Sequence, residues 1–289
     1  MQLILTNKNN QTLDLLNNKH RFILKSAEAL HGIDTDIIES ESPYVDGSEI
    51  DDVKALPRGI ELTFKLIGNV QQAIDYFTSI VKSKQWVTLR EIENERDIVI
   101  KGVATIPPYT RMSRSCEIVL SIYCPKPYWE DLEEVISVID DVVNLLTFPA
   151  IGQYFTPTGR PFGAINTNLT KILMNEGAVK VGALFSIAAT GEVVNPQINC
   201  DSGEQLGNYM RLNLTLQNGD EVFINTVKGN KYITINGSDT FNGLPILSYL
   251  EFQGEDWLQL ETGENKFTIT VSSGKQNVYF NASYKRLYE

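Results

Sequence analysis

The hydrophobic and polar positions of the chain alternate most clearly over residues 116–124. Every second residue from Ile118 to Cys124 is apolar, and this period of two is typical of a strand with one buried face. Pro125 and Pro127 follow directly. Proline cannot donate to a sheet ladder, so the strand is expected to end at Cys124.

Further elements are predicted on both sides of this strand. Apolar residues recur at helical spacing over 70–81, after Asn69 as N-cap, and again over 131–146. Alternation predicts a strand over 59–67 and a hairpin of 86–92 with 97–105. The first part of the chain is therefore expected to be an α+β domain, mainly antiparallel β with one or two helices.

From about residue 165 the pattern contains only short strands. Asn218-Gly219 and Asn236-Gly237 separate such runs, and Asn-Gly is a strong hairpin signal. Regular spacing of this kind predicts an all-β sandwich or jelly roll. The Gly-, Pro- and Thr-rich run 152–163 is the predicted linker, so we expect one domain over 1–150 and a second over 151–289.

Charge and composition exclude several classes of partner. The net charge of −11 argues against nucleic acid or an anionic membrane as the main partner. No apolar run is long enough for a membrane span, and the N-terminus does not have the pattern of a signal peptide. The three cysteines, an odd and sparse number, are expected to stay reduced during folding.

No catalytic or metal-binding set emerges from the residues. His20 and His31 are the only histidines, no cysteine lies near them, and no nucleophile or phosphate-binding motif is present. We therefore expect no enzyme activity, no metal and no cofactor. Trp257 and Tyr209 are candidates for stacking on a sugar, although strand aromatics more often pack in a core.

Several short motifs, in their order along the chain, resemble the distal tail protein family of siphophages. They are Asp46-Gly47, Pro57-Arg58 at the start of a strand, and Pro127-Tyr128-Trp129 after the strand that ends at Cys124. Lys126 stands where the family usually has an acidic residue. Residues 258–267, with Gly263 and Asn265, resemble the family's Leu-x-x-Gly-x-Asn turn.

This resemblance implies a structural hub in a phage or prophage tail. Such proteins form a hexameric ring through their N-terminal domains, which continue the tail tube. Their C-terminal galectin-like, carbohydrate-binding-module-like sandwiches project outward and can carry fibre or receptor-binding proteins. The resemblance also implies assembly in the host cytoplasm and a place at the tail tip, or baseplate, of the virion.

Three hypotheses follow. The first is the distal tail hub, with the hairpin of residues 86–105 as a contributor to the ring interface. The second is an adhesion protein whose C-terminal sandwich binds host-surface carbohydrate, which is compatible with the first. The third, a tail-associated hydrolase, has the least support, because no nucleophile, base and acid can be named together.

Overall fold

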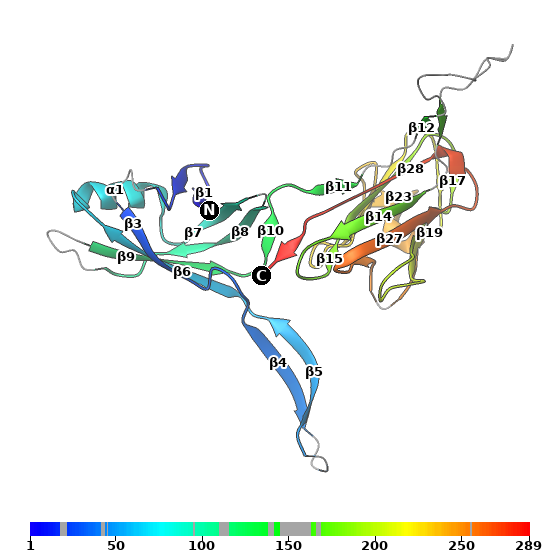
Figure 1. The fold of residues 1–289 in the computed structure, drawn as a ribbon. Helices are drawn as coiled ribbons and strands as arrows, with labels where there is room; N and C mark the ends of the chain where they lie inside the picture. Colours follow the sequence, from blue (N-terminus) through cyan, green and yellow to red (C-terminus); the bar gives the residue numbers. More distant parts are fainter. Residues whose placement is uncertain are drawn as a thin grey trace, which may run out of the picture. The chain divides into compact units, whose positions relative to one another are not determined.

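The computed structural model describes residues 1–17, 22–41, 44, 46–94, 96–109, 116–137, 142–144, 163–165, 169–254 and 256–289. The chain forms two compact units, Met1–Leu132 with Leu287–Glu289, and Glu133–Arg286 (Figure 1). The division thus lies before the predicted boundary at 150/151. That boundary and most of the predicted linker fall outside the described residues.

The described part of the first unit contains one large antiparallel sheet, a separate two-stranded hairpin and one α-helix. Its elements are β1 Gln2–Asn7, β2 Thr12–Asp14, β3 Phe22–Glu28, β4 Thr35–Glu41, β5 Ser48–Ala55, β6 Arg58–Leu66, α1 Val70–Ile80, β7 Gln85–Glu93, β8 Arg96–Thr105, β9 Cys116–Cys124, β10 Trp129–Asp131 and β29 Leu287–Tyr288. The strand order in the sheet is β2-β1-β7-β8-β9-β6-β3, and β10 pairs with both β8 and β29.

Helix α1 covers one face of this sheet. It begins where the Asn69 side chain accepts a hydrogen bond from the Gln72 amide at 3.3 Å. Phe77 on the helix packs against Phe64 of β6 and Phe22 of β3, with ring centroids 5.4 and 6.2 Å apart. The predicted helix, the β7–β8 hairpin and strand β9 are confirmed, and the apolar positions of β9 are buried.

The second unit is built from short strands. They are β11 Val135–Ser137, β12 Val142–Asn144, β13 Gly163–Ile165, β14 Thr170–Asn175, β15 Val181–Gly182, β16 Leu184–Ala189, β17 Val193–Val194, β18 Gln197–Cys200, β19 Tyr209–Leu212, β20 Thr215–Leu216, β21 Glu221–Asn225, β22 Tyr232–Ile235, β23 Thr240–Phe241, β24 Leu244–Pro245, β25 Leu250–Gln253, β26 Gln259–Leu260, β27 Gly263–Thr270 and β28 Val278–Tyr284. The described residues of this unit also include the 3₁₀ turns Ile246–Tyr249 and Lys275–Asn277.

Two five-stranded antiparallel sheets form the core of this unit. Their orders are β11-β28-β16-β21-β22 and β14-β27-β18-β19-β25. The sheets meet through aromatic side chains, because the ring centroid of Phe185 of β16 lies 5.4 Å from that of Phe267 of β27 in the other sheet. Phe280 of β28 stacks on Phe185 within the same sheet, with ring centroids 5.9 Å apart. The predicted all-β character of this part is confirmed.

The predicted second helix over 131–146 is wrong wherever this stretch is described. Val135–Ser137 form strand β11 and pair with Ala282–Tyr284 of β28, and Val142–Asn144 form strand β12. Residues 138–141 and 145–146 lie outside the described part. The apolar stripe fits a helix, but Val135 and Ile136 are β-branched and favour the pleated geometry that pairing with β28 supplies.

Candidate functional site

The feature of the first unit that stands out from its core is a two-stranded arm, β4–β5 (Figure 1). Its strands pair with each other over Thr35–Glu41 and Ser48–Ala55, and they pair with no other described strand. Almost every side chain of the arm is exposed. The arm therefore has four solvent-facing sides: two faces and two edges.

The two faces of the arm differ in polarity. Residues that pair across an antiparallel ladder lie on the same face, so Ile37 with Val53, and Ile50 with Glu39, share one face. The exposed fractions are 50% for Ile37, 52% for Val53 and 60% for Ile50. We call these three side chains the apolar face of the arm.

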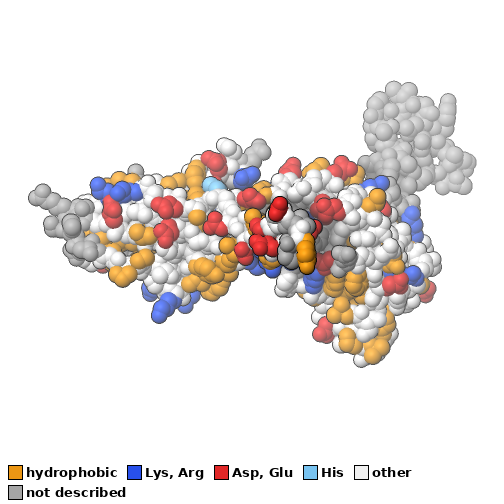
Figure 2. Space-filling model, turned by 90° about the horizontal axis from the view of Figure 1, so that it is seen from below, with side chains coloured by type: hydrophobic (Ala, Val, Ile, Leu, Met, Phe, Trp, Pro, Cys, Tyr) orange, Lys and Arg blue, Asp and Glu red, His pale blue; other side chains and the backbone are white. Residues whose placement is uncertain are grey.

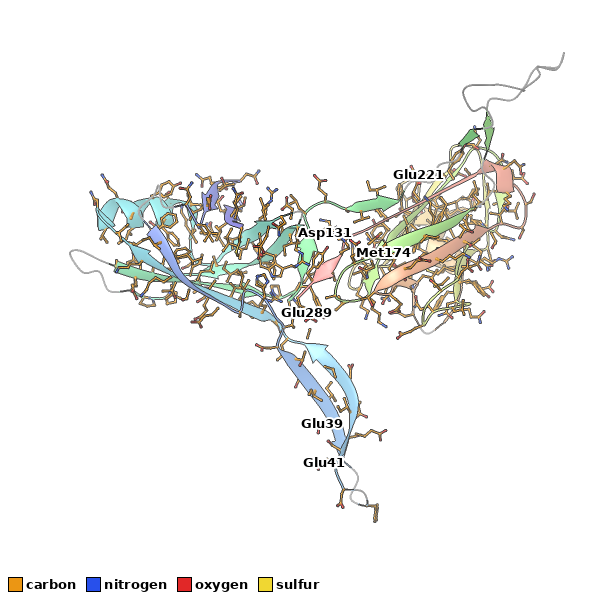
Figure 3. The ribbon with its side chains drawn as sticks, viewed as in Figure 1. Glu39, Glu41, Asp131, Met174, Glu221 and Glu289 are labelled. Atoms are coloured by element: carbon orange, nitrogen blue, oxygen red, sulfur yellow. The ribbon has the colours of Figure 1, made fainter. Side chains whose placement is uncertain are left out.

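The arm is also strongly acidic. Its acidic residues outnumber the single base, Lys54, by eight to one over residues 34–56, and they are Asp34, Asp36, Glu39, Glu41, Asp46, Glu49, Asp51 and Asp52. Figure 3 labels Glu39 and Glu41 toward the tip of the arm. A basic partner surface would therefore attract this arm.

We call the residues just before β4 and just after β5 the two roots of the arm. One backbone carbonyl forms hydrogen bonds that connect these roots to the rest of the first unit. The Leu30 oxygen, just before β4, accepts hydrogen bonds from Arg58 Nη1 at 2.8 Å and from Trp129 Nε1 at 2.9 Å. Arg58 is the first residue of β6, just after the arm returns, and Trp129 is fully buried at the start of β10. We call Leu30, Arg58 and Trp129 the root cluster.

The guanidinium of Arg58 is buried. Its Nε and Nη2 atoms are buried and have no hydrogen-bond partner among the described residues. Cys124 lies opposite Arg58 in the β6–β9 ladder, and burial raises the pKa of the Cys124 thiol to about 11, so the thiol stays protonated at neutral pH. Burial also lowers the pKa of Arg58. Guanidinium groups nevertheless remain charged in proteins.

The motif residues of the sequence analysis lie in three separate places. Arg58 and Trp129 meet at the root cluster, with Pro127 buried and Tyr128 half-buried beside it in sequence. Pro57 is exposed at the returning root of the arm. Asp46 and Gly47 are exposed in the connection between β4 and β5, where Gly47 has a φ of +99° that favours glycine.

Gly263 and Asn265 form a turn in the second unit. The buried Asn265 side chain donates to the carbonyls of Glu261 at 2.7 Å and Gly263 at 3.0 Å, and it accepts from the Glu261 amide at 2.7 Å. Gly263 has a φ of +93°. The motif therefore stabilises the turn that leads into β27, and in the described structure it has this structural role only.

The two candidate sugar-stacking residues are both half-buried, and each has its own polar neighbour. Tyr209 donates to Glu251 at 2.9 Å, and this hydrogen bond raises the pKa of Tyr209. Trp257 lies under Lys231, with Nζ 5.8 Å from the ring centroid. Tyr209 lies in β19 and Trp257 precedes β26, and no described contact joins them. Sugar binding stays a prediction.

A buried carboxylate lies near the arm root as well. Glu91 of β7 is buried, and its Oε2 lies 3.5 Å from Nε2 of the half-exposed His31. Burial raises the pKa of Glu91, while His31, Arg96 and the terminal amine lower it and Glu93 raises it further. The folded state therefore favours the protonated form of the Glu91 carboxyl over the charged carboxylate.

This raised pKa predicts a pH-dependent effect of Glu91→Gln. The contribution of Glu91 to stability is complete below its ordinary pKa of 4.5 and falls as pH rises through the raised value. Glu91→Gln should therefore raise the melting temperature at pH 7 and leave it unchanged near pH 4. Calorimetry at both pH values checks this. The exposed Glu28→Gln control should show no such difference, and an equal gain at both pH values for Glu91→Gln would contradict the interpretation.

Among the described residues, no group of three His, Cys, Asp or Glu side chains is arranged to hold a metal ion. No helix in the described part of the chain is long and apolar enough to cross a membrane.

Three comparisons relate this geometry to known proteins. Residues 176–288 match the family "Siphovirus-type tail component, C-terminal domain". The crystal structure of SPP1 Dit, a hub of the adsorption apparatus in phages that infect Gram-positive bacteria, has a TM-score of 0.63, 12% sequence identity and coverage of 99% of each chain. The phage P2 baseplate in its activated conformation with calcium gives a TM-score of 0.45 at 12% identity, covering 99% of this chain and 97% of the other. No curated protein matches the chain.

Residues 176–288 therefore belong to a siphovirus-type tail component domain, and the comparisons support a structural, non-enzymatic tail protein. The whole chain shares the fold of SPP1 Dit, and the comparisons support a phage distal tail, or baseplate hub, component at the tail tip. The predicted family, class of function and location are confirmed.

Proposed function

We propose that six copies of this chain form a ring that joins the tail tube to the tail tip. In this proposal the first unit makes the ring. The second unit is a galectin-like, carbohydrate-binding-module-like sandwich that faces outward and contacts tip, fibre or receptor-binding proteins. The observation that carries the proposal is the exposed arm, because a surface of this kind needs a partner.

Two physical arguments support the need for a partner. An isolated two-stranded hairpin is marginally stable in water, and the described arm packs neither face against its own unit. Its apolar face would gain free energy from burial against another chain. A contact between two different patches, arm and acceptor, is heterologous, and it generates a closed ring when the rotation between copies closes.

The arm, and not a strand edge of the β7–β8 hairpin, supplies the proposed pairing edge of the ring contact. The hypothesis for residues 86–105 requires free strand edges, but β7 pairs with β1 and β8, and β8 pairs with β7, β9 and β10. Both edges of this hairpin are thus occupied within one chain. Only the arm combines two free edges with an exposed apolar face in the described part of the first unit.

Substitution on the apolar face of the arm should abolish the ring. Ile37→Asp with Val53→Asp places two further charges where burial is proposed, so we expect the particle to fall from about six times 32.5 kDa to a single chain. Light scattering gives the mass, and negative-stain images show the ring. Asp36→Asn with Lys54→Gln alters a cross-strand pair on the opposite face and should leave the ring intact. A wild-type chain that remains monomeric at high concentration would contradict the proposal.

A further inference from the structure

The sheet face opposite α1 carries an exposed aromatic row across three strands. Trp86 of β7 pairs with Val103 of β8, and Val103 pairs with Tyr123 of β9. The exposed fractions are 56% for Trp86 and 57% for Tyr123, and Val103 is half-buried between them. We call these three residues the aromatic row.

The row spans two strand spacings of the sheet. Adjacent strands lie about 4.8 Å apart, so Trp86 and Tyr123 are separated by about 10 Å. Gly59 of β6 pairs with Tyr123 at the end of the row, and a β-carbon added at Gly59 would meet no other atom within 4 Å. Trp and Tyr are the residues that most often dominate binding at protein interfaces.

Basic side chains lie near the row in sequence and on the sheet. Lys84 precedes Trp86 by two residues, Lys101 precedes Val103 by two, and Lys126 follows Tyr123 by three. All three are exposed, and none forms an ion pair with another described residue. Figure 2 shows hydrophobic side chains beside both Lys and Arg and Asp and Glu side chains on this side of the first unit. The row therefore matches the apolar face of the arm in chemistry, and the three lysines beside it are opposite in charge to the acidic side chains of the arm.

We infer that the aromatic row of each copy receives the apolar face of the arm of a neighbouring copy. This inference rests on the proposed ring and names the surface that closes it. The two patches stay exposed within one chain, so the arm does not cover the row of its own copy. Arm and row are different patches, as a head-to-tail contact requires.

Loss of the row should prevent the ring while the fold persists. Trp86→Ser with Tyr123→Ser removes exposed rings, so we expect native circular dichroism and a monomeric mass by light scattering. Ile23→Ser removes an exposed apolar side chain from the edge strand β3 of the same sheet and should leave the ring intact. A row variant that still forms the ring would overturn the inference.

Cross-linking between two marked copies tests the contact directly. Val53→Cys chains mixed with Trp86→Cys chains should join through a short thiol-specific linker, because the three native cysteines are buried. Lys54→Cys, on the opposite face of the arm, should join Trp86→Cys much less.

A wild-type ring without the Val53–Trp86 cross-link would refute this contact but would leave the proposed ring unaffected. Absence of any wild-type ring would refute the proposed function itself. Capture of another tail protein by the row, with the ring intact, would also refute the inference.

Discussion

Trp129→Ala should lower the free energy of unfolding of the first unit by about 3–5 kcal/mol. The Trp129 side chain is fully buried, so its loss leaves a large cavity. The indole also donates to the Leu30 carbonyl at 2.9 Å, and this bond holds the outgoing root of the arm. We expect the variant to lose the order of the arm root at lower denaturant concentration than the wild type.

Two other variants separate the causes of this effect. Trp129→Phe keeps most of the packing and loses the hydrogen bond, so it should cost about 1–2 kcal/mol. Trp86→Ala removes an exposed indole and should change stability by less than about 0.5 kcal/mol. Far-UV circular dichroism during guanidinium unfolding measures all three, in a monomeric Ile37→Asp, Val53→Asp background so that assembly does not contribute. Equal losses for Trp129→Ala and Trp86→Ala would show that Trp129 has no structural role at the root.

The elements that sequence reasoning predicted correctly are those with one buried side. Strand β9 and helix α1 each place apolar residues on one face against the core, and this contrast between faces is what periodicity detects. The arm was missed because neither of its faces packs on its own core. Its available signal was Asp46-Gly47 between two stretches rich in β-branched and acidic residues, which is hairpin chemistry.

Two of the three residues of the root cluster could be predicted from the sequence. The resemblance singled out Arg58 and Trp129, but the group that joins them is the backbone carbonyl of Leu30, and a carbonyl has no side-chain signature. The wrong helix over 131–146 has a different cause. The spacing of its apolar residues is compatible with a helix. The strand forms instead because Val135 pairs with Tyr284 of β28, and local spacing cannot reveal a partner so far along the chain. The short strands β14, β16 and β18 were expected only as part of a general all-β pattern.

Asn265→Ala should lower the free energy of unfolding of the second unit by about 2–4 kcal/mol, the sum of three lost hydrogen bonds. The side chain of Asn265 is buried, and its loss would leave the Glu261 amide and two carbonyls without their partner. Water has little access to replace them at this depth. The effect should appear in the unfolding of the second unit and leave the first unit unchanged, because all three bonds lie within residues 261–265.

Asn199→Ala provides the matched control. Asn199 lies on the neighbouring strand β18, and its amide also donates two hydrogen bonds, to Thr268 and Thr270 at 3.0 Å each. It is half-buried on the outer side of the sheet, so water can replace these bonds and the cost should stay below about 1 kcal/mol. Calorimetry of both variants, with each transition assigned to its unit, measures the difference. A cost for Asn265→Ala no larger than that of Asn199→Ala would mean that Gly263 and the backbone pairing of β27, rather than the Asn265 side chain, hold the turn.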